Sequence, residues 1–518
     1  MKQLADFDLS IVIPIYNHLD EVNALSPSMV KYYERNGIEV VIVADKSADQ
    51  TDFLDYIRAY PFINWKVIVG NEGLLWQNPG KALNIGIRQA TKQYILIMDS
   101  RQEFYTDVIY ELREKLEHYP EHYAISQVLS LDTQEKINER ILEKHRCELV
   151  PYGSIMAKKE YFELIGGYSE CQLEWKIRHK NLCIRFDLAG IRQLFFPDAV
   201  SISQNGFLLG IKNQSEQQVQ ISQNTLSEKL LPTAINENGT KWGYGFNTVI
   251  YDWKINPFAK QQCYNYLATL KQFDILADEV FDKTFPLIAL IPTYNESERI
   301  VECLRSAEKY CDGIILLDDD SMDDTYQIVK SEKLLVKAKK CRTEFNDKEN
   351  RNILLDIASF FKAKWFIFLD ADERFDDRFV DIREVMEKQD VDTVGVWIAN
   401  LWDDVETYRV DMEDVNPNSK NGLWFRWRMF RNKGRMQIFS PYKLHFSTIP
   451  YRYREYISET LMLHFGYLNM NKRAIKYQFY VHEDKIKLLN YENILSEKCK
   501  LDRISNIKSW MFMTQKVL

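Results

Sequence analysis

The cysteines of the sequence form no recognisable motif, and its first residues do not resemble a signal peptide. Its eight cysteines, at positions 147, 171, 183, 263, 303, 311, 341 and 499, form no C-x-x-C motif. This scatter indicates neither a zinc site nor a disulfide framework, and it favours a reducing cytoplasm. Residues 1–8 lack the apolar core of a signal peptide. We therefore predict a cytoplasmic location.

Long apolar runs and an excess of basic residues are also missing. No segment approaches the ~18 apolar residues of a membrane-spanning helix, so we expect at most peripheral contact with a membrane. The 67 basic residues against 75 acidic ones give a net charge of −8, which argues against a general nucleic-acid-binding surface. The basic-aromatic segments 451–454 and 472–473 could touch anionic lipid, although such segments more commonly face solvent.

Apolar strands and helix-compatible segments alternate along the chain. At 518 residues with 46% hydrophobic content, the chain can form two or more full-sized domains. The first hundred residues contain four predicted strands, which begin near residues 9, 38, 65 and 94 and are separated by segments that suit helices. This alternation is typical of an α/β fold with a doubly wound, mostly parallel sheet.

The same order of motifs occurs a second time. Segments 287–295, 313–325 and 365–372 repeat the first, second and fourth strands of the first copy. The prolines, acids and turns that follow these strands recur at nearly constant separation, which chance explains poorly. We predict two copies of one domain, at 1–225 and 285–518, joined by a connector at 226–284.

The most informative segment is Trp365–Glu373, an apolar strand that runs into clustered carboxylates. Ligands of open α/β sheets bind beyond the carboxyl ends of the strands, where Asp370, Asp372 and Glu373 would project. Carboxylates this close repel each other, and a hard divalent cation that also carries phosphate oxygens would relieve the repulsion. An isolated D-x-D would more often be a solvated acidic turn, so the neighbouring motifs decide its meaning.

Three motifs stand together in the second copy. They are Pro-x-Tyr-Asn at 292–295, Asp-Asp-x-Ser-x-Asp at 318–323 and Asp-Ala-Asp-Glu at 370–373. The set resembles the inverting family 2 glycosyltransferases of GT-A fold, and the likeness extends over both copies. The resemblance implies two tandem GT-A domains, a nucleotide-sugar donor, most simply a UDP-sugar, and a saccharide or lipid-linked acceptor.

The resemblance also implies roles in donor binding. Pro292 and Tyr294 would border the base, and Asp319 would accept a hydrogen bond from a uracil-like imide. Arg351, at the start of a helix, would face the diphosphate. Taken singly, Tyr294 would equally suit a core aromatic and Arg351 a surface position.

Metal binding and base catalysis follow from the same resemblance. Asp370 and Asp372 would hold Mn²⁺ or Mg²⁺, which would stabilise the leaving nucleotide as a Lewis acid. His464 lies in a segment similar to the family's His-Tyr-Gly-Tyr element and would be a third ligand or a diphosphate contact. A core histidine is the alternative. The general base would be an acid facing the acceptor hydroxyl, and Asp404 and Asp403 are the candidates.

The first copy departs from the family's pattern. Its D-x-D position reads Asp99-Ser100-Arg101, which places a fixed cation where a second metal ligand is expected. Further along, Trp175 stands where the family's catalytic Asp is usual, which leaves Glu174 as the candidate acid there. Either Arg101 supplies part of the metal's charge, or the first copy does not transfer sugar.

We therefore predict an inverting glycosyltransferase of bacterial surface polysaccharide or glycolipid synthesis that works in one displacement step. In one alternative, only the second copy is catalytic and the first is a binding or scaffold domain. A nucleotidyltransferase would also use strand-end acids and a metal. It would, however, have a Gly-rich basic loop after the first strand, and residues 292–296 do not form one.

Overall fold

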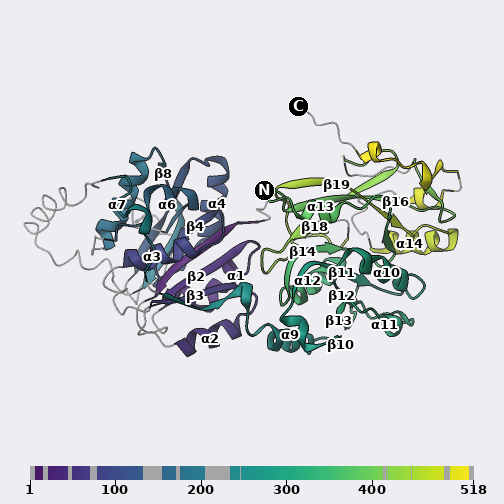
Figure 1. Cartoon of the computed structure of the whole chain (residues 1–518), viewed down its shortest axis with the longest axis horizontal. Coiled ribbons are helices and arrows are strands. Elements are labelled where there is room, and N and C mark those ends of the chain that lie inside the picture. Colours follow the sequence, from purple (N-terminus) through teal and green to yellow (C-terminus); the bar gives the residue numbers. More distant parts are fainter. Residues whose placement is uncertain are drawn as a thin grey trace, which may run out of the picture. The chain divides into compact units, whose positions relative to one another are not determined.

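The chain folds into two compact units, residues 1–257 and 258–518, each built around one nine-stranded sheet (Figure 1). The computed structural model describes residues 6–15, 22–44, 50–70, 79–131, 154–170, 175–204, 234–245, 247–411, 416, 418–444, 446–483, 491–496 and 498–512. Both sheets are mixed and carry helices, which confirms the predicted α/β fold class.

The first unit alternates strands and helices through its first hundred residues, as predicted. Its strands are β1 (Leu9–Ile15), β2 (Ile38–Ala44), β3 (Asn64–Gly70), β4 (Tyr94–Ile97), β5 (Gln102–Phe104), β6 (His122–Leu131), β7 (Ile155–Lys158), β8 (Arg192–Gln204) and β9 (Asn247–Asp252). Its α-helices are α1 (Pro27–Tyr33), α2 (Gln50–Ala59), α3 (Pro79–Gln89), α4 (Val108–His118), α6 (Lys159–Ile165) and α7 (Trp175–Leu188).

The second unit has a corresponding set of elements and a small extra sheet. Its strands are β10 (Gln272–Ile275), β11 (Thr284–Thr293), β12 (Gly313–Asp318), β13 (Leu334–Lys339), β14 (Lys362–Phe368), β15 (Glu373–Phe375), β16 (Thr393–Asn400), β18 (Leu423–Arg431) and β19 (Glu455–His464), with β17 (Thr407–Arg409) and β20 (Leu501–Arg503) in the small sheet. Its α-helices are α9 (Ala259–Leu267), α10 (Ile300–Tyr310), α11 (Thr325–Ile328), α12 (Asp347–Ala358), α13 (Ile382–Met386) and α14 (Met470–Glu483).

The two large sheets have the same strand order. It reads β9-β3-β2-β1-β4-β7-β6-β8-β5 in the first unit and β10-β13-β12-β11-β14-β18-β16-β19-β15 in the second. The central four strands are parallel in each, and the corresponding outer strands run in corresponding directions. The repeat of sequence motifs is thus accompanied by a repeat of topology that extends to every strand of both large sheets.

The units meet in sequence at Pro257, inside the segment predicted as a connector. Two short strands of that segment, β9 and β10, belong to the sheets. Strand β9 pairs antiparallel with β3 in the first unit, and β10 pairs antiparallel with β13 in the second. These edge strands are short and polar, so their apolar patterning gave little signal at the sequence level.

Burial of apolar surface explains the arrangement of the central strands. Every residue of β1 and β2 is buried, as expected for parallel strands that are covered on both faces. Helix α3 packs on β1 and β2, and α12 packs on β11 and β12. The loops at the carboxyl ends of the parallel strands are thereby set on a rigid support.

A second correspondence lies in the side chains of α3 and α12. The amide of Asn84 accepts from the backbone N–H of Tyr168 at 2.7 Å and donates to its carbonyl at 2.8 Å. Asn352 makes the same two hydrogen bonds with Ile438. It accepts from the backbone N–H at 2.7 Å and donates to the carbonyl at 3.1 Å. Each pair of hydrogen bonds fixes a segment that lies between β7 and β8 or between β18 and β19. A side-chain amide suits this task because it both donates and accepts.

Candidate functional site

The predicted donor-site residues of the second unit gather at the carboxyl ends of its parallel strands. Pro292 lies in β11 opposite Leu317 of β12, and Tyr294 follows the end of β11 by one residue. Asp319 follows β12 directly, and Asp370 lies two residues beyond β14. Because β12, β11 and β14 are adjacent and parallel, their ends meet at one edge of the sheet. This is the edge at which open α/β sheets bind ligands.

Asp319 and Tyr294 are both held by cations. The Asp319 carboxylate lies 3.0 Å from Nη1 of Arg342 and 3.3 Å from Nζ of Lys340. The guanidinium of Arg342 also lies over the ring of Tyr294, 3.8 Å from its centroid. Burial raises the pKa of Asp319, while the two cations favour its charged form. The predicted base-binding pair is thus joined through one arginine that the sequence did not single out.

Polar side chains tie the loop after β11 to the turn after β12. The backbone N–H of Asn295 donates to Oγ of Ser321 at 2.8 Å, and the Asn295 side chain accepts from the N–H of Met322 at 2.9 Å. Asp318 in turn accepts from the N–H of Ser321 at 2.8 Å. Asp318 and Ser321 therefore shape the loops of this site.

Both oxygens of Asp370 are bound by arginines. Nη2 of Arg351 lies 2.7 Å from Oδ1, and Nη2 of Arg428 lies 2.9 Å from Oδ2. The same nitrogen of Arg428 donates to Glu373 at 2.6 Å. Burial alone would raise the pKa of Asp370, but the two arginines hold it below its usual value. Burial raises the pKa of Glu373 to about 7 against the opposing charge of Arg428.

Asp372 is surrounded by a different set of basic groups. Its Oδ2 lies 2.9 Å from Nζ of Lys476, 3.2 Å from Nε2 of His464 and 3.6 Å from Nη1 of Arg299. Burial opposes the charged carboxylate, yet the charge of Lys476, with His464 and Arg299, keeps the pKa of Asp372 well below its usual value. Asp372 is therefore an anion around which this edge of the site is organised.

His464 presents an unprotonated nitrogen to Asp372 and Lys476. Its Nδ1 lies 2.8 Å from Oδ1 of Asn400, which can act only as an acceptor. Burial lowers the pKa of His464, so the ring is neutral near pH 7 and Nε2 carries the lone pair. Lys476 donates to this nitrogen across 3.1 Å. The antiparallel pairing of Glu373 with His464 brings the imidazole to this edge.

The donor atoms at Asp372 and His464 fit a divalent cation. A carboxylate oxygen and a neutral imidazole nitrogen converge on one point, and this combination suits Mn²⁺ better than Mg²⁺. Asp370, the other predicted ligand, has both oxygens engaged by arginines. Within the described ranges no three His, Cys, Asp or Glu side chains form a complete metal cage. A metal at this point would take further ligands from the phosphates of a bound donor.

The predicted general bases lie outside this cluster. Asp403 has a left-handed backbone (φ 64°), is about half exposed and pairs with Nη2 of Arg473 at 2.9 Å. Asp404 accepts from the N–H of Glu406 at 2.7 Å and so closes a turn. Glu174 of the first unit lies outside the described residues.

The corresponding edge of the first unit has different chemistry. Nε of Arg101 lies 3.7 Å from Oδ1 of Asp99. Gln102 pairs with Ser203 across β5 and β8, in the register at which Glu373 pairs with His464. The Gln102 side chain accepts from Oγ of Ser154 at 3.0 Å. Neutral amide and hydroxyl groups thus replace the glutamate and imidazole of the second unit.

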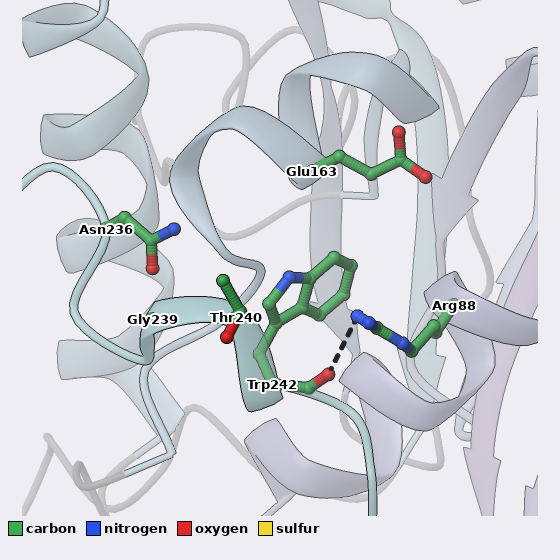
Figure 2. A pocket seen from close by; sticks show the side chains of 6 residues that line it. All are labelled: Arg88, Glu163, Asn236, Gly239, Thr240 and Trp242. Atoms are coloured by element: carbon green, nitrogen blue, oxygen red, sulfur yellow. Dashed lines mark hydrogen bonds between the residues drawn. The ribbon is translucent and has the colours of Figure 1, made fainter.

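The first unit also contains a cavity of about 440 Å³ at the last turn of α3 (Figure 2). Figure 2 shows the indole of Trp242 at its centre with Arg88 beside it, and Arg88 donates to the Trp242 carbonyl at 3.1 Å. Helix α3 starts at the carboxyl edge of the sheet and ends at the opposite edge, where β4 begins. The cavity therefore lies at the end of α3 that is away from Asp99. Its lining residues are Arg88, Glu163, Asn236, Gly239, Thr240 and Trp242.

The basic-aromatic segments considered for lipid contact have acidic partners within the chain. The pairs are Arg452 with Glu455, Arg454 with Asp392, Lys472 with Glu298 and Arg473 with Asp403. In the part of the chain that the structure describes, none of the helices has the length and hydropathy needed to cross a bilayer.

Sequence reasoning missed the basic half of the cluster. Arg299, Arg428 and Lys476 all contact the clustered acids. None of the three was assigned a role from the sequence. The arginines of β18 stand among large apolar residues. This was an available signal for Arg428, because a charge that becomes buried in such a strand requires a partner.

Comparison with known proteins now decides the family. The sequence model of glycosyl transferase family 2 matches residues 10–174 and 288–457, well over half of the chain. The chain belongs to glycosyl transferase family 2. One matched segment falls in each unit. The predicted family is confirmed.

Curated relatives match shorter stretches of this member of family 2. The SPbeta prophage-derived glycosyltransferase SunS of Bacillus subtilis is 31% identical over 110 residues, which cover 20% of this chain and 25% of SunS. An uncharacterized glycosyltransferase of Haemophilus influenzae is 27% identical over 175 residues, covering 31% of this chain and 56% of that protein. The chain thus spans about a quarter to a half of the length of these relatives.

Solved structures of glycosyltransferases also resemble this chain. Residues 1–349 of S. aureus TarS, in complex with UDP-GlcNAc, are 16% identical with a TM-score of 0.30, covering 43% of this chain and 66% of that one. The mannosyltransferase PcManGT of Pyrobaculum calidifontis, in complex with GDP-Man and Mn²⁺, is 18% identical with a TM-score of 0.29, covering 38% and 56%. At these TM-scores the family assignment rests on the sequence model.

Proposed function

We propose that the second unit transfers a sugar with inversion from a nucleotide-diphosphate donor, most simply a UDP-sugar, and that the first unit is a non-catalytic copy. The observation that carries this proposal is the contrast between the two strand-end sites. Asp372 with His464 presents two metal-binding atoms in the second unit. The first unit has Arg101 and Ser203 at the corresponding positions.

Donor binding would use groups that the fold already holds in place. Tyr294 and Asp319 would frame the base, and displacement of Arg342 from them would open that space. Mn²⁺ or Mg²⁺ would be held by Asp372 and His464 beside Asp370, and when bound it supplies Lewis-acid stabilisation of the departing diphosphate. Arg351 would support the site indirectly, because its Nη2 donates to Oδ1 of Asp370 at 2.7 Å and holds that carboxylate in place.

The acceptor would be a saccharide or a lipid-linked saccharide. Its hydroxyl oxygen would form the new bond to the anomeric carbon as the bond to the diphosphate oxygen breaks, and its proton would pass to a carboxylate that acts as general base. We assign Asp403 this role ahead of Asp404, whose carboxylate is engaged in a turn. Asp403 follows Trp402 in the chain, and a series of ring contacts leads from Trp402 to His464. The ring centroids of Trp402 and Tyr467 are 5.6 Å apart, and those of Tyr467 and His464 are 4.9 Å apart.

The cellular setting belongs to the same proposal. A cytoplasmic enzyme at the inner face of the cell membrane, acting in bacterial surface polysaccharide or glycolipid synthesis, would meet both nucleotide sugars and lipid-linked acceptors. Arg452 and Arg454 are paired with acids of the chain, which leaves less of their charge for contact with anionic lipid.

Donor hydrolysis by the full chain tests the assignment of the two units. We would measure nucleotide release from UDP-glucose, UDP-GlcNAc, UDP-galactose and GDP-mannose with Mn²⁺, for the wild type, Asp372→Asn and Asp99→Asn. Asp372→Asn is expected to reduce release by ~100-fold or more, whereas Asp99→Asn should retain it. Unchanged metal-dependent turnover in Asp372→Asn would refute the assignment of the second unit.

The same assay separates the remaining alternatives. Equal losses in both variants would make the first unit catalytic as well. Release of pyrophosphate from a nucleoside triphosphate, without release of nucleoside diphosphate from the sugars, would favour a nucleotidyltransferase.

A further inference from the structure

Lys476 of α14 occupies the point at which a metal would bind. Its Nζ lies 2.9 Å from Oδ2 of Asp372 and 3.1 Å from Nε2 of His464, and it sits 4.9 Å from the ring centroid of Tyr467. An ammonium has three N–H donors. Two of them can bind Oδ2 of Asp372 and Nε2 of His464 here. Lys476 is thus a cation built into the chain at the position proposed for an external one.

The imidazole makes the two cations mutually exclusive. Nε2 of a neutral histidine has a single lone pair, which can accept from an ammonium or bind a metal but cannot do both. His464 cannot turn its other nitrogen to the site, because Nδ1 is bonded to Asn400 at 2.8 Å. A metal can therefore reach His464 only after Lys476 has left it.

The backbone of Gly466 lies close to Asp372, His464 and the ammonium of Lys476. A Cβ at Gly466 would lie 2.6 Å from Oδ2 of Asp372 and 2.6 Å from Nε2 of His464, and closer still to Nζ of Lys476. Real Cβ atoms do not approach heavy atoms this closely. The absence of a side chain thus creates a cradle for one cation, bounded by the Gly466 backbone, Asp372 and His464.

We propose that Lys476 holds the Asp372–His464 pair closed until the donor binds, and then moves to the donor's diphosphate so that the metal can enter. This inference rests on the proposed function of the second unit. The lysine stem is long and flexible, and a diphosphate that shares the metal lies within its reach. Metal and nucleotide then bind in a coupled manner, and Asp372 retains a cation at every stage.

Manganese binding by the full chain provides the test. We would measure free Mn²⁺ by electron paramagnetic resonance, with and without UDP, for the wild type, Lys476→Met and the control Lys472→Met. Lys472 lies one turn earlier on α14 and pairs with Glu298 rather than with Asp372. Isothermal titration with UDP alone would report nucleotide affinity without metal, and Lys476→Gln would replace the methionine variant if that variant does not fold.

Lys476→Met is expected to bind Mn²⁺ about ten-fold or more tightly than the wild type without UDP, because a like charge a few ångströms from the metal is gone. UDP should tighten Mn²⁺ binding by a larger factor in the wild type than in this variant, and UDP alone should bind the variant more weakly. Lys472→Met should behave like the wild type.

The outcomes separate this inference from the proposed function. Equal Mn²⁺ affinity in the wild type and Lys476→Met, or an equal effect of UDP on both, would overturn the role of Lys476 while leaving the metal site intact. Absence of Mn²⁺ binding by every variant with UDP present would overturn the metal site as well. Mn²⁺ binding that survives in Asp372→Asn would place the metal elsewhere and overturn both.

Discussion

Replacing Arg428 with methionine should strongly destabilise the strand end that carries the site. Arg428 is 4% exposed and neutralises both Asp370 and Glu373, which lie 2.9 and 2.6 Å from its Nη2. Methionine has a similar length but no charge, so two carboxylates lose a counter-charge that they share. Removal of one partner from a buried ion pair costs about 3–5 kcal/mol, and we expect a loss of that size.

Arg452 offers a matched control on the surface of the same unit. It forms two bonds with Glu455, at 2.8 and 3.0 Å, but the two side chains are 48% and 38% exposed. Exposed pairs contribute about 0–1 kcal/mol. Arg452→Met should therefore cost much less than Arg428→Met, although both remove an arginine from an ion pair with good geometry.

Hydrogen exchange measured by mass spectrometry suits this comparison, since a two-unit chain need not unfold in one step. Peptides from β14, β15 and β18 should lose protection in Arg428→Met, and Glu373→Gln added to that variant should restore part of it. If Arg428→Met costs no more than Arg452→Met, or if Glu373→Gln restores nothing, the ionic cluster is not what holds this edge together.

Two further predictions concern the space around Asp372. Gly466→Ala should abolish Mn²⁺-dependent donor hydrolysis, because its Cβ would fill the cation cradle, and steady-state kinetics that match the wild type would contradict this. Burial and the nearby Asp372 raise the pKa of Glu296 to about 7. A raised carboxyl pKa contributes stability at low pH that is lost as pH rises through 7, so wild-type stability should fall between pH 5 and 7.5. Glu296→Gln should remove about 1–3 kcal/mol of that fall, and a thermal-denaturation series with the same pH slope as the wild type would contradict it.

The sequence predicted the parallel half of each sheet well. Continuous apolar runs that end in Pro-x-Tyr-Asn, in paired acids or in D-x-D mark strands and their carboxyl ends, because local patterning and strand topology determine both. The edge strands β9 and β10 were placed in a connector because short, polar strands resemble loops until a neighbouring strand pairs with them.

The acids of the site could likewise be named from the sequence, whereas their partners could not. Asp370 and Asp372 lie two and four residues beyond the end of β14, so their position is fixed by a short stretch of chain. Arg428 reaches Asp370 from β18, and Lys476 reaches Asp372 from a helix more than a hundred residues away in sequence. Such contacts depend on strand order and register, which periodicity does not reveal.

The sequence by itself therefore determined the repeat of motifs, the family and the strand-end carboxylates, since each is a local pattern. Only the tertiary structure decided which cations neutralise those carboxylates and that an ammonium occupies the point shared by Asp372 and His464. The physical reason is that a buried charge requires a partner, while the folded chain alone determines which distant side chain can supply one.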